Sequence, residues 1–266
     1  HHLLWALEVL CWSPDYLVRA TQILTELCRY ELPKNSGNNP LASMSSVLCG
    51  WIRNTGADLA VRLQALDACR VVSATTGWAL LKALWPDSNA LVSPPNEPRY
   101  QLWKPPSERM PNSEWSAFAT SLVDRALEWV KADRTALPWL VEALSTVGTD
   151  GANRIIEFLE EEASRGDLDE DVRLALFEQV RETAARHERF QDADWAMPAE
   201  RRARLHKMAD LLQPADDLRR FAYLFNWRPD LSDADVNDYE HYRTALEAKR
   251  REALDVLFAR ADAWEQ

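Results

Sequence analysis

The residues closest to a metal-binding motif are acidic side chains in the second half of the chain. Asp167, Asp169 and Asp171 have the spacing of the first, third and fifth ligands of a calcium loop, and Glu178 stands at the twelfth position. The sixth position of such a loop requires glycine, but here it is Val172, so the sharp turn cannot form. Carboxylates in the first turn of a helix are stabilised by its dipole. We therefore predict a helix from residue 169 and no metal site.

Other glutamates and histidines also lack the arrangement of a catalytic set. Opposite charges three or four residues apart stabilise a solvated helix face, and Glu161 with Arg165 is such a pair. The glutamates on this predicted face are Glu157, Glu160, Glu161 and Glu162. Three histidines stand far apart among arginines and glutamates, and we predict exposed helical positions for them. They are His187, His206 and His241.

Motifs for common enzyme chemistry are absent from the sequence. It contains no phosphate-binding glycine loop, no dinucleotide fingerprint, no nucleophile elbow and no HExxH zinc motif. We therefore predict no catalytic, cofactor-binding or metal-binding residue, and no enzyme activity in this segment. The four cysteines share no metal-ligand spacing, and each lies in an apolar helical stretch, which predicts reduced core thiols in a cytoplasmic protein. They are Cys11, Cys28, Cys49 and Cys69.

Charge is distributed unevenly along the chain. Residues 1–132 contain 12 acidic and 12 basic residues, whereas residues 133–266 contain 30 acidic and 19 basic residues. An acidic surface repels nucleic-acid phosphates, so nucleic acid is not an expected partner. One basic cluster in the acidic half is expected to pair with neighbouring acidic helices. It comprises Arg201, Arg202, Arg204, Lys207, Arg219 and Arg220. No run of 18 apolar residues occurs, so no membrane span is predicted.

The best candidate contact surface lies in a proline-rich segment, residues 86–111, which holds seven of the 14 prolines. Proline excludes helix there, and long loops in helical proteins are often functional. Arg99, Tyr100, Trp103 and Lys104 are of the types found in such contacts, since Tyr, Trp and Arg are enriched in interface hot spots. We predict that these four residues bind a partner. The alternative is that Tyr100 and Trp103 only pin the loop onto the helices.

Helical signals dominate the rest of the chain. Only seven glycines occur in 266 residues, which disfavours a turn-rich β fold. Ser13-Pro14 and Asn39-Pro40 are helix starts, Gly166 is a helix end, and apolar residues recur at a 3.6-residue period. The sequence predicts an all-α fold.

A faint repeat suggests how these helices are organised. Trp-Ala-Leu at residues 5–7 recurs at residues 78–80, with unequal spacing to other echoes. We predict irregular antiparallel helical repeats, solenoid-like, with one long proline-rich loop. A plain bundle remains an alternative, and one array or two packed bundles are both open. The predicted regions are N-terminal repeats at 1–85, the proline-rich loop at 86–111 and acidic C-terminal repeats at 112–266.

Several segments together resemble a region of large bacterial multidomain proteins. They are Leu3-Leu4-Trp5-Ala6-Leu7-Glu8, Trp12-Ser13-Pro14, Asn39-Pro40, Pro98-Arg99-Tyr100 with Trp103, and Phe221-Ala222-Tyr223-Leu224-Phe225 with Arg228-Pro229. These proteins are similar to the STAND-type ATPases of bacterial antiviral defence, relatives of the NLR immune receptors. The resemblance implies a C-terminal helical region that senses a phage protein, joined to effector and nucleotide-binding domains. The chain has no Walker motif and no initiator methionine, so we expect a sensor segment of a longer protein.

The function expected from these features is binding of a macromolecule without chemistry in this segment. The leading hypothesis is the sensor or scaffold part of a bacterial antiphage defence protein, which binds a protein partner such as a phage protein and contacts the flanking domains. A purely structural helical spacer is the alternative. A small helical enzyme based on carboxylates is disfavoured, because no nucleophile, base or metal set emerges. The identity of the ligand and the oligomeric state are left open.

Overall fold

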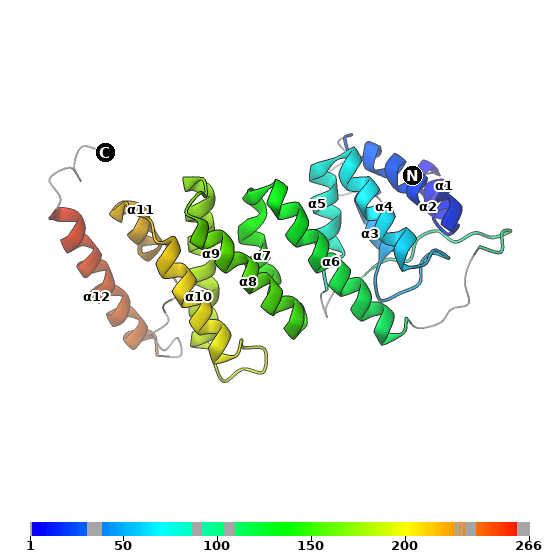
Figure 1. Ribbon diagram of the computed structural model, residues 1–266. Helices are drawn as coiled ribbons and strands as arrows, with labels where there is room; N and C mark the ends of the chain where they lie inside the picture. The colour runs from blue at the N-terminus through cyan, green and yellow to red at the C-terminus, as the bar shows by residue number, and fades with distance from the viewer. Residues whose placement is uncertain are drawn as a thin grey trace. The chain divides into compact units, whose positions relative to one another are not determined.

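The computed structural model describes residues 2–30, 39–86, 92–103, 110–226, 229, 231 and 238–259. Within these ranges the chain forms twelve α-helices and two short 3₁₀ helices, and no strand (Figure 1). The prediction of an all-α fold is confirmed. The chain divides into two compact units, His1–Ala126 (unit 1) and Leu127–Gln266 (unit 2).

Unit 1 is built from short helices that pack around buried leucines. In this unit α2 packs against α1, α3 and α4, and α5 packs against α3 and α4. Leu17, Leu24 and Leu66 are among the fully buried side chains of this core. The helices are α1 (His2–Leu10), α2 (Pro14–Leu27), α3 (Pro40–Leu48), α4 (Leu59–Val72), α5 (Ala74–Ala83) and α6 (Asn112–Ala132), and the unit boundary falls within α6.

The two predicted helix starts of unit 1 are confirmed, but only one of them has a side-chain cap. Pro14 opens α2 directly after Ser13, whose side chain makes no capping hydrogen bond. Asn39 precedes α3, and its side-chain oxygen accepts a hydrogen bond from the backbone N–H of Ala42 at 2.8 Å. Both signals act locally, since Pro14 has a fixed helical φ and the Asn39 oxygen satisfies a backbone donor that the helix itself leaves unpaired.

Unit 2 contains longer helices, of which α9 packs against α7 and α10, and α8 packs against α7 and α10. Gly166 ends α8 with φ 71°, a left-handed conformation that favours glycine. Asp169 caps α9 as predicted, so the calcium-like acidic residues lie at a helix start. The elements are η1 (Arg134–Ala136), α7 (Leu137–Ala143), α8 (Thr149–Arg165), α9 (Glu170–Arg189), α10 (Ala199–Leu212), α11 (Asp217–Phe221), η2 (Ala222–Phe225) and α12 (Tyr239–Phe258).

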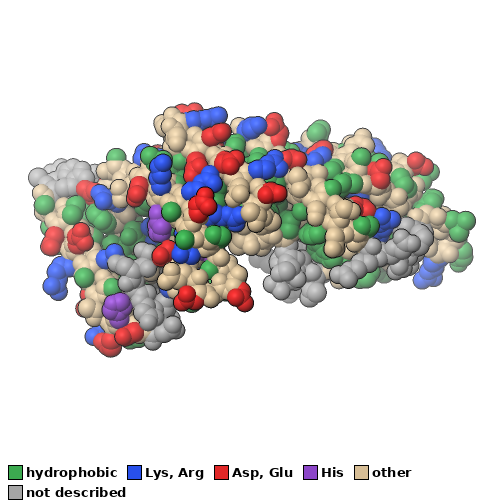
Figure 2. Space-filling model, turned by 60° about the horizontal axis from the view of Figure 1, so that its bottom comes forward, with side chains coloured by type: hydrophobic (Ala, Val, Ile, Leu, Met, Phe, Trp, Pro, Cys, Tyr) green, Lys and Arg blue, Asp and Glu red, His purple; other side chains and the backbone are tan. Residues whose placement is uncertain are grey.

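Ion pairs link the basic cluster of unit 2 to acidic helices, as predicted. Arg204 of α10 forms two hydrogen bonds to Glu160 of α8, from Nε at 2.8 Å and from Nη2 at 2.7 Å. Arg202 bonds to Glu188 of α9 at 2.8 Å. The bonds from Arg204 hold the pKa of Glu160 below its usual value. On the face shown in Figure 2, acidic and basic side chains accordingly lie side by side.

One detail of the acidic α8 face differs from the prediction. Glu162 is buried, and it pairs with Arg165 at 2.6 Å and with Arg134 of η1 at 3.0 Å. The predicted partner of Arg165 was Glu161. Glu162 and Glu161 stand three and four positions before Arg165, so either can lie beside it on the helix. Packing against η1 selects Glu162.

The cysteines are free thiols, and all but Cys28 are fully buried. Burial raises the pKa of Cys11 to about 12 and that of Cys28 to about 11. The predicted core position holds for Cys11, Cys49 and Cys69, whereas Cys28 is only half-buried. No helix among the described residues is both long and apolar enough to cross a bilayer. The repeat architecture and the three predicted regions stay predictions.

Candidate functional site

The predicted contact residues of the proline-rich segment occupy different environments. Arg99 is exposed, and the Tyr100 side chain is 91 % exposed. Trp103 is half-buried and packs edge-to-face against Tyr16 of α2, with ring centroids 5.8 Å apart. Lys104 lies outside the described residues. We name the surface formed by Tyr16, Arg99, Tyr100, Leu102 and the half-buried Trp103 the loop surface.

A buried carboxylate fixes the segment that precedes the loop surface. Glu8 of α1 is 6 % exposed, and its carboxylate accepts three hydrogen bonds. The Ser43 hydroxyl donates to Oε1 at 2.5 Å, and the backbone N–H and side-chain amide of Asn96 donate to Oε2 at 2.8 and 2.5 Å. Trp12 Nε1 also donates to the carbonyl of Asn96 at 2.9 Å. Buried polar groups are stable only when bonded in this way, so Asn96 is held on α1 and α3.

A close backbone approach fixes the other end of the same segment. The N–H of Gly56 donates to the carbonyl of Trp12 at 2.9 Å. A Cβ at position 56 would meet the carbonyl oxygen of Trp103 at 2.9 Å and that of Trp12 at 3.0 Å. Only glycine leaves room for these two carbonyls, so the main chain of Trp103 lies directly on the turn before α4.

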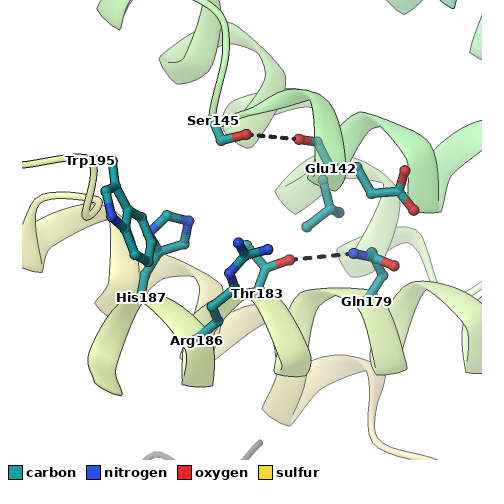
Figure 3. Close-up of a pocket in the computed structure, with 8 residues that line it drawn as sticks. Glu142, Ser145, Gln179, Thr183, Arg186, His187 and Trp195 are labelled. Carbon is teal, nitrogen blue, oxygen red and sulfur yellow. Dashed lines mark hydrogen bonds between the residues drawn. The ribbon is translucent and has the colours of Figure 1, made fainter. Parts of the chain in front are cut away.

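A second candidate site is a pocket in unit 2 between α7 and α9, closed on one side by Trp195 (Figure 3). Its volume is about 170 Å³. We name it the His187 pocket. It is lined by Val141, Glu142, Ser145, Gln179, Thr183, Arg186, His187 and Trp195. Its walls combine hydroxyl, amide, imidazole and guanidinium groups with the Val141 and Trp195 side chains, so it can bind a ligand that has both polar and apolar parts.

His187 is buried, which corrects the prediction of an exposed histidine. The side chain is 4 % exposed, and Nδ1 accepts a hydrogen bond from the backbone N–H of Met197 at 3.1 Å. The ring also packs against Trp195, with centroids 5.4 Å apart. Burial lowers the pKa of His187, and Arg186 and Arg202 lower it further. The ring is therefore neutral at neutral pH, and the hydrogen sits on Nε2.

Sequence reasoning missed the His187 pocket, although one signal was available. Leu176, Val180 and Ala184 form the buried stripe of α9, and the next position of that stripe is 187. A histidine that continues an apolar stripe is expected to be buried. Trp195 could not be placed in the same way, because it follows α9 in a turn.

Among the described residues, the glutamates and histidines singled out in the sequence do not come together in one catalytic arrangement. His206 and His241 lie on α10 and α12, away from α9 in the chain. No group of three His, Cys, Asp or Glu side chains among the described residues could hold a metal ion. Comparisons of the chain with protein-family models, with curated proteins and with solved structures found no match.

Proposed function

We propose that this chain binds a protein partner through the loop surface and carries no chemistry of its own. The observation that carries the proposal is the contrast within residues 92–103. Asn96 is tied down by the buried Glu8 carboxylate, whereas Tyr100 and Leu102 are almost completely exposed. Apolar side chains that face water gain free energy when a partner covers them.

The anchored backbone makes this surface suited to recognition. A loop that is already ordered loses less conformational entropy on binding than a free one. Tyr100, Trp103 and Arg99 are of the residue types that dominate interface energetics. Trp103 and Tyr16 add an aromatic pair beside the exposed residues.

The biological setting is the second part of the proposal. The segment would act as the sensor or scaffold region of a larger bacterial antiphage defence protein, with a phage protein as its partner. Support for this setting comes from the sequence resemblance to STAND-type ATPases. The competing assignment is a structural spacer, which would need no exposed recognition residues.

The test is a pull-down with matched variants. The purified chain is the bait against lysates of uninfected and phage-infected bacteria. The test variant is Tyr100→Ala with Leu102→Ala. The control is Tyr30→Ala with Val71→Ala, because Tyr30 and Val71 are 71 % and 85 % exposed elsewhere on unit 1.

We expect one phage protein to be recovered by the chain and by the control, with at least about tenfold less recovery by the test variant. Equal recovery by the test variant would show that the loop surface is not the contact. Recovery of no phage protein by any bait would favour the structural spacer.

A further inference from the structure

The His187 pocket has an exposed arginine, Arg186, in its lining. Arg186 projects from α9 toward the space below α7 (Figure 3). Its guanidinium lies 5.6 Å from the centre of the Trp195 ring, and no carboxylate of the described residues pairs with it. Most other arginines of unit 2 have an acidic partner, for example Arg204 with Glu160. Arg186 is therefore available to an anionic ligand.

His187 adds a neutral donor beside this cation. Because Nδ1 is occupied by the N–H of Met197, Nε2–H is the one ring donor left for a ligand. The amide of Gln179 and the hydroxyl of Thr183 lie on the same helix, within one turn of each other and 3.5 Å apart. The lining thus has one cation, Arg186, one anion, Glu142, and neutral polar groups, of which the Gln179 amide already donates to the Thr183 hydroxyl.

The charge of the lining selects the class of ligand. A planar carboxylate matches the two parallel N–H groups of a guanidinium, and it adds only one negative charge to a pocket that already contains Glu142. A phosphate dianion would leave a charge uncompensated beside Glu142. Val141 and Trp195 offer an apolar wall. An apolar cavity of about 150 Å³ holds benzene, so a pocket of about 170 Å³ holds a ligand with a ring of that size.

We propose that the His187 pocket binds a monocarboxylate that carries a small apolar body. The carboxylate can belong to a free small molecule or to the C-terminal residue of a peptide. Arg186 binds the carboxylate, His187 and the neutral donors orient it, and Trp195 covers its apolar part. The site uses residues of unit 2 alone and does not depend on the loop surface.

The experiment is a ligand titration of the ¹⁵N-labelled chain, with the indole N–H signal of Trp195 as the readout. The signal is assigned by its loss in Trp195→Phe. The ligands are benzoate, benzyl alcohol, inorganic phosphate, and an acetylated peptide ending in phenylalanine with either a free carboxylate or an amide. The variant is Arg186→Gln, and the control is Arg251→Gln, because Arg251 is exposed on α12.

We expect benzoate to shift the Trp195 signal with a dissociation constant on the order of 1 mM, as is usual for a ligand of this size. Arg186→Gln should weaken binding by about tenfold or more, since bonds to charged groups are the strong ones, and Arg251→Gln should not. Benzyl alcohol and the peptide amide should bind correspondingly weakly. Tighter binding of the peptide acid than of benzoate would identify a peptide as the source, and the reverse would identify a free molecule.

Three results would overturn the proposal. The first is no shift of the Trp195 signal by benzoate or by the peptide acid at about 20 mM, well above the expected dissociation constant. The second is equal affinity of Arg186→Gln, with its other indole signals unchanged. The third is binding of benzyl alcohol or phosphate as tight as that of benzoate.

Discussion

The loop surface of unit 1 and the His187 pocket of unit 2 use polar groups in opposite ways. Beside the loop surface the buried Glu8 carboxylate is bonded to Ser43 and Asn96, while the apolar residues Tyr100 and Leu102 face water. In the pocket the polar groups face a hollow, and Arg186 has no acidic partner among the described residues. A bonded buried polar group supports structure, whereas an unbonded accessible one is open to a ligand.

The two units also differ in charge. Unit 1 has 11 acidic and 11 basic residues, while unit 2 has 31 acidic and 20 basic residues. Unit 1 as a whole therefore neither attracts nor repels a charged partner at long range. A polyanion would be repelled by unit 2, but a single carboxylate beside Arg186 feels mainly that local cation, because salt screens charges beyond about 10 Å.

The largest expected effect comes from removing the carboxylate that holds the loop. Glu8→Ala leaves the Ser43 hydroxyl and both Asn96 donors without an acceptor. We expect the free energy of unfolding of unit 1 to fall by about 3–5 kcal/mol, since the buried Ser43 hydroxyl loses its acceptor at a cost of about 1–3 kcal/mol and the bonds of the exposed Asn96 to the charged carboxylate are lost as well. Urea unfolding followed by thiol labelling measures unit 1 alone, because all four cysteines lie there, three of their native thiols are buried, and the raised pKa of the half-buried Cys28 slows its reaction.

The matched control for this prediction is Glu26→Ala. Glu26 is exposed and forms a surface pair with Arg29, so its loss should change the free energy of unfolding by less than about 0.5 kcal/mol. Equal destabilisation by the two variants would show that the Glu8 network does not stabilise unit 1.

A smaller effect is expected where the main chain of Trp103 approaches the turn before α4. Gly56→Ala places a methyl group against two carbonyl oxygens, at 2.9 and 3.0 Å, and backbone atoms cannot move aside cheaply. We expect a loss of about 1–3 kcal/mol in urea unfolding, as in other overpacked sites. Gly148→Ala is the control, since nothing lies within 4 Å of its Cβ, and it should cost a few tenths of a kcal/mol. A neutral Gly56→Ala would mean that the loop can shift without cost.

The smallest effect concerns the pocket and depends on pH. The pKa of His187 is lowered in the native state by burial, by Arg186 and by Arg202. As pH falls through the ordinary value of 6.5, the unfolded chain takes up a proton before the native chain does. Stability is therefore full above this pH and decreases below it, by at most about 1.4 kcal/mol per pH unit.

The variant His187→Asn tests this dependence. The Asn side-chain oxygen can accept the Met197 N–H, but the side chain does not titrate in this range. Between pH 7.5 and 5.5 we expect the free energy of unfolding of the unmutated protein to fall by about 1 kcal/mol more than that of the variant, because the variant lacks the histidine that takes up a proton on unfolding. Urea unfolding measures both. A constant difference between the two proteins across this range would contradict the assignment.

The helices could be predicted from the sequence because their signals are local. Ser13-Pro14, Asn39-Pro40 and Gly166 act within one turn, and each marks a helix end in the structure. The helical signals after Pro214 favour one helix, but the chain forms α11 and η2 there. The signals for the last helix favour a start near residue 235, which lies outside the described residues, and α12 begins at Tyr239.

The sites could be predicted only in part, because tertiary packing decides them. Exposure of Tyr100 follows from no spacing rule, and the partners of Glu8 lie 35 and 88 residues away. The His187 pocket needs α7, α9 and the turn with Trp195 to meet. A lone acid on the buried face of α1 and a histidine on the apolar stripe of α9 were the signals in the sequence, and each indicates a burial that only a distant segment can satisfy.

The Glu8 contact also has a consequence for synthesis on the ribosome. Asn96 is 88 residues downstream, and at about 5–20 residues per second it is made about 4–18 seconds after Glu8. During that interval α1 and α3 gain little by closing over a carboxylate that lacks its amide donors, so Glu8 stays hydrated. Translation of the proline-rich segment thus completes the Glu8 contact, and a nascent chain that pauses before it exposes this part of unit 1 to chaperones.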